Sequence, residues 1–288
     1  MIRNKVVLKS LFLVFCAMSW LAVSLSYADM AVKADELIVK SGLQRQIGQL
    51  PEVVSASFEQ RMAQDDKIGP EEAAKIREAI TRSVTPSVML ASIKEHIIAN
   101  LAEPDVDGIM TWLKSPLGEK ITKMEEDASS GQAYMEIQNF AMGLANNPPD
   151  PVRVEVLGQL DEAARMTEFS VGMKMDMVVT MTTAMAAAAG RSDLSKEELL
   201  ASLENSRAQI KEGSAQEVLI TGLYTYQGLT IDELKEYVNF YKSEAGQKYA
   251  DVITRGLLNA LNKSSQDMGE RLGKVIKEEN TKDAAASQ

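Results

Sequence analysis

Cysteine and histidine are nearly absent from this chain. Its 288 residues include one cysteine, Cys16, and one histidine, His96. Cysteine-based catalysis, thiolate zinc sites and multi-histidine metal sites all need more of these side chains than the sequence offers. A Ser-His-Asp triad would depend on His96, and no Gly-x-Ser-x-Gly motif accompanies it. His96 lies in a helical pattern, so we interpret it as a packed or surface residue and expect a non-catalytic protein.

The N-terminus has the pattern of a secretory signal peptide. Arg3, Lys5 and Lys9 precede an apolar stretch from 11 to 25, and the segment ends in Ser26-Tyr27-Ala28. Small residues at these last positions predict cleavage after Ala28 and export to the periplasm. The stretch is shorter than the roughly 20 residues of a membrane-spanning helix, so we expect no span after signal removal. An uncleaved N-terminal anchor is the alternative.

Basic and aromatic residues are scarce in the predicted mature chain, residues 29–288. It keeps 28 basic and 41 acidic side chains, a net charge of −13, together with one tryptophan, four phenylalanines and six tyrosines. Nucleic acid and anionic lipid both favour basic surfaces, and stacking on sugars or unpaired bases needs more aromatic rings. We therefore expect neither nucleic acid nor an anionic membrane as a partner.

Apolar residues recur every three or four positions nearly throughout, and no strand-like alternation persists. Pro70 and Pro151 are placed where prolines begin helices. Ser195 with Glu198, and Thr230 with Glu233, have the spacing of capping boxes. The sequence predicts an all-α protein of about ten helices.

A segment of the chain occurs twice. "IMTWLKSPLGEKI" at 109–121 matches "YVNFYKSEAGQKY" at 237–249 with a constant offset of 128. The break "NNPPDP" at 146–151 falls between the copies. We therefore predict two related helical halves from an internal duplication, at 29–147 and 148–288, after a signal peptide at 1–28. The aligned pairs are Trp112 with Phe240, Lys114 with Lys242, Ser115 with Ser243, Gly118 with Gly246, and Lys120 with Lys248.

The second copy, "LTIDELKEYVNFYKSEAGQKYADVI", resembles the signature helix pair of an exported bacterial family, domain of unknown function 2059. The shared pattern is a capped helix, a Phe-Tyr pair, and a Ser-x-x-Gly-x-Lys step into the next helix. At 100–124 Trp112-Leu113 replaces the aromatic pair, but the step is kept. The resemblance implies an all-helical periplasmic domain and brings no catalytic residues or substrate.

The repeated segment has a structural and a functional interpretation. Ser115 and Ser243 can cap the following helix, while Gly118 and Gly246 permit close helix approach. Because turn chemistry explains both copies, we favour a role in specifying the fold. The functional alternative is a groove that binds a partner, lined by Tyr224, Tyr237, Tyr241, Phe240 and Trp112.

Methionines are concentrated in "VGMKMDMVVTMTTAM" at 171–185. On a helix Met173, Met177, Met181 and Met185 form one stripe, while Met175 points away from it. Core packing against a close neighbour, aided by the following alanines, is the favoured interpretation. A pliable surface for a partner helix or an unfolded segment is the second. The third is a Cu(I) site at Met173, Met177 and Met181, because thioethers select that soft ion.

Together these features predict a periplasmic helical protein that binds another envelope protein or a peptide and has no resident cofactor. Two alternatives stay open. One is a Cu(I)-binding protein that uses the methionine stripe, and the other is an envelope chaperone that binds apolar peptide segments.

Overall fold

The structure, a computed structural model, describes residues 29–62, 69–190 and 196–286, and these residues form helices and no strand. The all-α prediction is confirmed. The predicted signal peptide, Cys16 and the Ser195 cap lie outside the described residues. The helices are a first helix at 29–40, α2 (Leu43–Met62), α3 (Pro70–Ser83), α4 (Pro86–Asn100), α5 (Glu103–Leu113), α6 (Pro116–Ala128), α7 (Gly131–Gly143), α8 (Pro151–Ala164), α9 (Met166–Ala188), α10 (Lys196–Thr225), α11 (Ile231–Lys242) and α12 (Glu244–Ala286).

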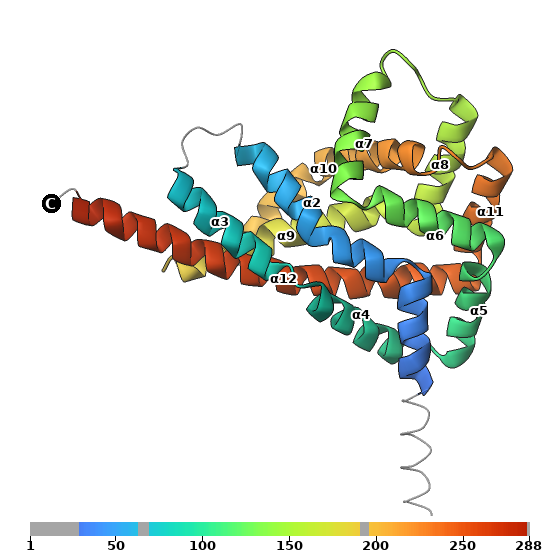
Figure 1. Ribbon diagram of the computed structural model, residues 1–288, viewed down its shortest axis with the longest axis horizontal. Helices are drawn as coiled ribbons and strands as arrows, with labels where there is room; N and C mark the ends of the chain where they lie inside the picture. Colours follow the sequence, from blue (N-terminus) through green and yellow to red (C-terminus); the bar gives the residue numbers. More distant parts are fainter. Residues whose placement is uncertain (1–28, 63–68, 191–195, 287–288) are drawn as a thin grey trace, which may run out of the picture.

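The 43-residue helix α12 is the axis of the molecule, and it runs along the whole length of the view in Figure 1. Helices α9, α4 and α3 pack along it, and α5, α8 and α11 contact it at its N-terminal end. Because α3 to α5 come from the first predicted half and α8 to α12 from the second, both halves contribute to one hydrophobic core. The predicted boundary at 147 lies between α7 and α8.

Local capping chemistry starts the helices where the sequence predicts. Helices α3 and α8 begin at Pro70 and Pro151, and the Asp150 side chain accepts a hydrogen bond from the Val152 amide at 2.9 Å. The predicted capping box of α11 is present. Thr230 accepts from the Glu233 amide at 3.2 Å, and the Glu233 carboxylate accepts from the Thr230 amide at 2.8 Å.

The two copies of the repeated segment have the same corner. Ser115 caps α6 by accepting from the Gly118 amide at 3.0 Å, and Ser243 caps α12 by accepting from the Gly246 amide at 3.1 Å. A Cβ atom on Gly118 would lie 2.2 Å from the Trp112 carbonyl oxygen, and one on Gly246 would lie 2.0 Å from that of Phe240. Both glycines are therefore required by close backbone approach, as the structural interpretation of the segment expects.

Two ion pairs connect the copies reciprocally. Lys120 of the first copy lies 2.7 Å from Glu233 beside the second, and Lys248 of the second lies 2.6 Å from Asp105 beside the first. With the offset of 128, Lys120 is equivalent to Lys248 and Asp105 to Glu233. Such exchange of equivalent contacts is the mark of a two-fold interface. The two corners therefore face each other about a local two-fold axis.

The methionine run lies on α9, but its buried face is not the predicted stripe. Met175 is 6% exposed, whereas Met177 is 40% exposed. Met175, predicted to point away from the packed stripe, is therefore the buried methionine, and core packing fails for Met177 of the stripe. The reason is that α9 has apolar residues on all sides, so its pattern does not specify which side packs. The buried residues of α9 are Thr167, Val171, Met175, Val179 and Ala186.

Helices α9 and α12 approach closely where the alanines follow the methionines. A Cβ atom on Gly269 would lie 2.5 Å from the Met181 carbonyl oxygen, and one on Gly273 would lie 2.4 Å from that of Met185. The Cβ atoms of Ala184 and Ala188 on α9 flank these contacts. The predicted close approach of a neighbour to this small-residue surface is confirmed.

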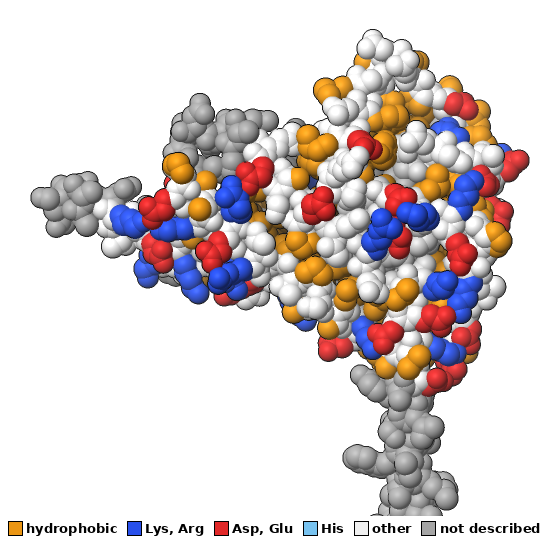
Figure 2. Space-filling view, viewed as in Figure 1, with side chains coloured by type: hydrophobic (Ala, Val, Ile, Leu, Met, Phe, Trp, Pro, Cys, Tyr) orange, Lys and Arg blue, Asp and Glu red, His pale blue; other side chains and the backbone are white. Residues whose placement is uncertain are grey.

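Acidic and basic side chains are interspersed over the face drawn in Figure 2. Many of them pair, as Lys33 does with Glu103 and Asp107, both at 2.7 Å. None of the described helices combines the length and the apolar character needed to cross a bilayer.

Candidate functional site

A carboxylate on the inner side of α6 is the centre of the candidate site. The Glu125 Oε1 atom accepts hydrogen bonds from the hydroxyls of Tyr226 and Tyr237, each at 2.7 Å. Burial raises the pKa of the Glu125 carboxyl above its ordinary value, and the two tyrosine hydrogen bonds only partly oppose this. A perturbed carboxyl that lines a cavity is a candidate for function.

Glu125 lines a cavity of about 180 Å³, called here the Glu125 cavity. Its wall comes from the turn before α2, from α2 and α6, from the α8–α9 junction, and from α11 and α12. The lining residues are Ser41, Leu43, Gln46, Glu125, Ala164, Met166, Phe169, Tyr241, Tyr249, Ala250, Ile253, Thr254 and Leu257.

A second cavity, of about 170 Å³, adjoins the first and is called here the outer cavity. The two share four lining residues, Ala164, Phe169, Ala250 and Thr254. Charged side chains of Arg165, Glu168 and Asp251 line the outer cavity. Arg165 and Glu168 are exposed, so the outer cavity borders the charged surface of the protein.

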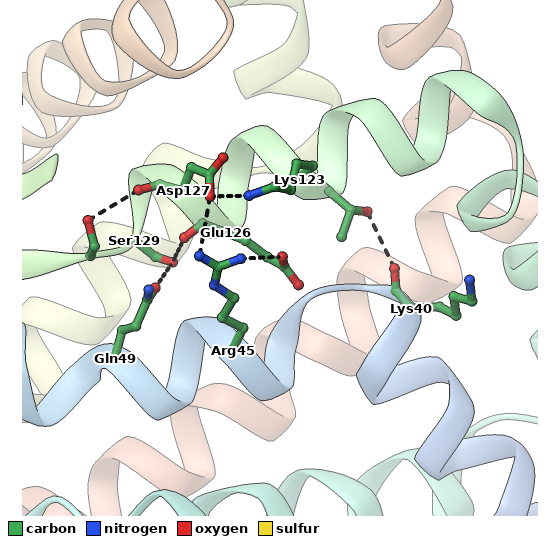
Figure 3. A network of polar contacts seen from close by, with 9 residues as sticks. Lys40, Arg45, Gln49, Lys123, Glu126, Asp127 and Ser129 are labelled. Atoms are coloured by element: carbon green, nitrogen blue, oxygen red, sulfur yellow. Dashed lines mark hydrogen bonds and ion pairs between the residues drawn. The ribbon is translucent and has the colours of Figure 1, made fainter.

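The turn at 41–42 brings α2 against α6 beside Glu125. Gly42 has a φ of +74°, and a Cβ atom there would lie 2.9 Å from Cγ of Glu126. Glycine is therefore needed for both its backbone conformation and the close approach. Figure 3 shows the polar contacts that hold this junction: Arg45 lies 3.2 Å from Glu126 and 3.3 Å from Asp127, and Ser129 donates to Gln49 at 2.6 Å.

The opposite wall is held by hydrogen bonds at the α8–α9 junction. Arg165 has a φ of 56°, which turns the chain between the two helices. Asp161 accepts from the amide and the hydroxyl of Thr167, at 2.7 and 2.6 Å. The Gln247 side chain donates to the carbonyl oxygens of Ala163, at 2.8 Å, and Tyr241, at 2.5 Å. Both sides of the cavity are thus fixed by contacts other than those of Glu125.

The structure brings four of the five predicted groove residues together. Trp112 stacks on Phe240 with ring centroids 4.7 Å apart and on Tyr237 at 5.9 Å, and Tyr237 lies 5.1 Å from the Tyr241 ring. Tyr237 and Phe240 are buried, so these rings form a packed cluster, and only Tyr241 of them reaches the Glu125 cavity.

Tyr224 lies apart from this cluster. Its ring packs edge-on against Phe140 at 5.8 Å, and its hydroxyl donates to Glu136 of α7. That hydrogen bond, followed by partial burial, raises the pKa of Tyr224 to about 12. His96, 128 positions before Tyr224, packs against Gly256 of α12, and its buried Nε2 atom has no hydrogen-bond partner among the described residues. His96 is thus a packed residue, as the sequence suggests.

The predicted copper ligands follow one another along one side of α9. Met177 is exposed, and Met173 and Met181 are half-buried. Within the described ranges, His, Cys, Asp and Glu side chains form no group of three or more that could hold a metal ion. A wider groove of about 550 Å³ lies between α9 and α12, lined by Thr180, Thr183, Ala184, Ala187, Ala188, Gln266, Glu270 and Lys274. Its carboxylate, Glu270, is exposed, whereas Glu125 is half-buried and accepts from two tyrosine hydroxyls.

Sequence reasoning missed Glu125, although a signal for it exists. Glu125 follows Ile121 by four positions and Leu117 by eight, so it continues the apolar face of α6. With the offset of 128 its equivalent is Ile253, which is buried and lines the same cavity. A carboxylate thus stands at a position that the other copy fills with an aliphatic side chain.

No protein-family model, curated protein or solved structure matches this chain.

Proposed function

We propose that this chain is a non-catalytic binding protein whose ligand occupies the Glu125 cavity. The observation that carries the proposal is the half-buried Glu125 carboxylate, which lines a cavity with one oxygen fixed by two tyrosine hydroxyls. A small concave site with few, well-held polar groups is the usual form of a ligand pocket. Burying a carboxylate without a full set of partners costs free energy, and a ligand that satisfied it would recover that cost.

The size of the cavity favours a small molecule over an apolar peptide segment. At about 30 Å³ per water molecule in the liquid, 180 Å³ corresponds to about six waters. The aromatic residues predicted to line a peptide groove are largely buried among themselves. This supports a small ligand in place of the envelope protein or peptide that the sequence predicts, and it weighs against the chaperone alternative.

A cavity-filling variant tests the proposal. Ala250 lines both cavities, so Ala250→Leu should occlude them, and Ala99→Leu on an exposed position of α4 is the matched control. Small-molecule binding would be followed through the fluorescence of Trp112, the single tryptophan of the predicted mature chain, which stacks on Tyr237. The proposal expects compounds that bind the wild type and Ala99→Leu but not Ala250→Leu. If every binder also bound Ala250→Leu, the cavity would not be the site.

Export to the periplasm is part of the proposal. It is supported by the basic start, the apolar stretch and the Ser26-Tyr27-Ala28 ending. Membership of the exported family that the repeated segment resembles is part of the same proposal. N-terminal sequencing of protein from the periplasmic fraction of a bacterial host should begin at Asp29. Recovery of a chain that still carries residues 1–28 in the membrane fraction would support a retained anchor.

Copper binding is a second candidate, and the accessibility of the methionine stripe favours it. None of Met173, Met177 and Met181 is fully buried, so their sulfur atoms are not sealed in the core. An anaerobic Cu(I) competition titration would compare residues 29–288 with a variant in which all three are leucine, a change that keeps volume and hydrophobicity. Stoichiometric binding that is lost in the variant would establish the site, and equal behaviour of the two would exclude it.

A further inference from the structure

The Glu125 carboxylate has hydrogen-bond donors but no counter-charge. In the part of the chain that the structure describes, no lysine, arginine or histidine nitrogen lies within ion-pair distance of it. Arg45, on α2 at the same junction, pairs with Glu126 and Asp127 instead (Figure 3). A buried carboxylate becomes far less costly when a positive charge is placed beside it. The missing element of this site is therefore a cation.

The rest of the cavity wall is suited to a cation with an apolar body. Phe169, Tyr241 and Tyr249 line the cavity, and aromatic faces attract positively charged groups. Met166 and Leu257 add aliphatic contact surface. No lysine or arginine is among the residues that line the Glu125 cavity, so an anionic ligand would meet the Glu125 carboxylate with no positive charge to offset the repulsion.

The charge that favours a cation is that of the whole chain and not of the outer cavity. In the outer cavity Glu168 pairs with Lys211 at 2.5 Å and Asp251 with Arg255 at 3.0 Å. The whole chain is acidic, with a net charge of −10. Acidic surroundings raise the local concentration of cations and disfavour anions.

We propose that the Glu125 cavity binds a small organic cation, with an ammonium group against the Glu125 carboxylate and its aliphatic part against Phe169, Tyr241 and Tyr249. This inference rests on the proposed function, because it names the ligand class of the same site. The cavity has room for a few carbon atoms beside the ammonium group, and the outer cavity can take the remainder of a longer molecule.

Three probes of nearly equal size separate charge from shape: butylammonium, butanol and butyrate. Each is titrated into wild-type protein and into Glu125→Gln, with Trp112 fluorescence and the unfolding temperature as readouts. Glutamine keeps an oxygen that can accept from Tyr226 and Tyr237, so the fold should be retained, which circular dichroism checks. We expect butylammonium to bind the wild type best and to bind Glu125→Gln at least about tenfold more weakly, as for a hydrogen bond to a charged group.

Phe169→Leu tests the aromatic wall independently of the carboxylate. Removing one aromatic face should weaken butylammonium binding by about threefold or more and leave butanol binding nearly unchanged. A structural effect of the substitution would instead weaken both probes alike.

The outcomes distinguish the two proposals. Butanol that binds the wild type as tightly as butylammonium, with no effect of Glu125→Gln, would overturn the cation inference and leave the cavity as a ligand site. Preferred binding of butyrate would overturn it in the same way. If none of the three probes bound, the cation inference would fall, and the Ala250→Leu comparison would decide whether the cavity binds any other compound.

Discussion

Trp112 and Phe240 stack face to face, with ring centroids 4.7 Å and ring planes 8° apart. They occupy equivalent positions of the repeated segment, 128 residues apart in the chain. Contact between a residue and its own equivalent is expected at a two-fold axis, as in a symmetric dimer. Together with the reciprocal Lys120–Glu233 and Lys248–Asp105 ion pairs, this stack supports the proposal that the chain arose by duplication of a unit that paired with itself.

The stack at this axis should be energetically coupled. Removal of either ring, in Trp112→Ala or Phe240→Ala, should lower the free energy of unfolding by about 3 to 5 kcal/mol. Because each variant deprives the other ring of its partner, the double variant should lose less than the sum of the two, by about 0.5 to 1.5 kcal/mol. Urea denaturation of the four proteins measures this. Additive losses would mean that the rings touch without stabilising each other.

The paired glycines provide a second test of the equivalent corners. In Gly118→Ala and Gly246→Ala the new methyl group would lie 2.2 and 2.0 Å from a carbonyl oxygen, so the helix corner must open. Each variant should lose more than about 3 kcal/mol of stability, as for other severe steric changes in a core. The matched control is Gly158→Ala inside α8, where the added Cβ atom would meet no atom outside its own helical turn within 4 Å.

Gly158→Ala should gain about 0.5 to 1 kcal/mol, because alanine is the better helix former. The free energy of unfolding from urea denaturation checks all three glycine variants. Equal, small effects at Gly118 and Gly158 would contradict the close contact of the corner.

Features that depend on neighbouring residues in the chain were predictable from the sequence. The starts of α3, α8 and α11 follow from proline in the first turn and from a capping box, chemistry that acts within four residues. The Ser115 and Ser243 caps belong to the same class.

Features that depend on which helices meet were not predictable. Apolar residues occur on every side of helix α9, so nothing local specifies that Met175 packs inward and Met177 outward. Glu125 continues the apolar face of α6, but only the fold shows that Tyr226 and Tyr237, about a hundred residues away, supply its donors. The cavity itself needs four separate stretches of the chain brought together, at 41–46, 125, 164–169 and 241–257, which periodicity cannot specify.

The raised pKa of Glu125 predicts how stability changes with pH. Above the ordinary carboxyl pKa of 4.5 the unfolded chain releases a proton that the folded protein still holds. The contribution of Glu125 to the free energy of unfolding is therefore fully present below the ordinary pKa of about 4.5. It is lost as the pH rises from there through the pKa of the folded protein. The surrounding Tyr226, Tyr237, Tyr241 and Tyr249 do not titrate in this window, because burial raises their pKa values above 10.

Glu125→Gln should remove this loss. The stability of the variant relative to the wild type should be constant below pH 4.5, rise through the window, and then level off, by about 1.4 kcal/mol for each unit by which the pKa is raised. Denaturation curves from pH 4 to 8 measure it, and Glu95→Gln, on an exposed position of α4, is the control substitution. A difference between Glu125→Gln and wild type that stays flat with pH would show that the carboxyl is not held protonated by burial.

The last prediction concerns His96, whose buried Nε2 atom has no hydrogen-bond partner in the part of the chain that the structure describes. Its ring lies against Gly256 of α12, and its Nδ1 atom lies 3.4 Å from the Asn100 amide nitrogen. An unsatisfied buried polar atom costs free energy, and an apolar side chain of similar size avoids that cost. His96→Leu should therefore leave the free energy of unfolding unchanged within about 0.5 kcal/mol or raise it.

His96→Asn is the contrasting variant, because it keeps a polar group at the same place and leaves a small void. It should lose about 1 to 3 kcal/mol, the cost of a buried polar group without a partner. Urea denaturation of both variants decides between packing and function for the single histidine of the chain. If His96→Leu were destabilised as much as His96→Asn, the imidazole would have to make a favourable polar contact, and a packing role alone would not account for it.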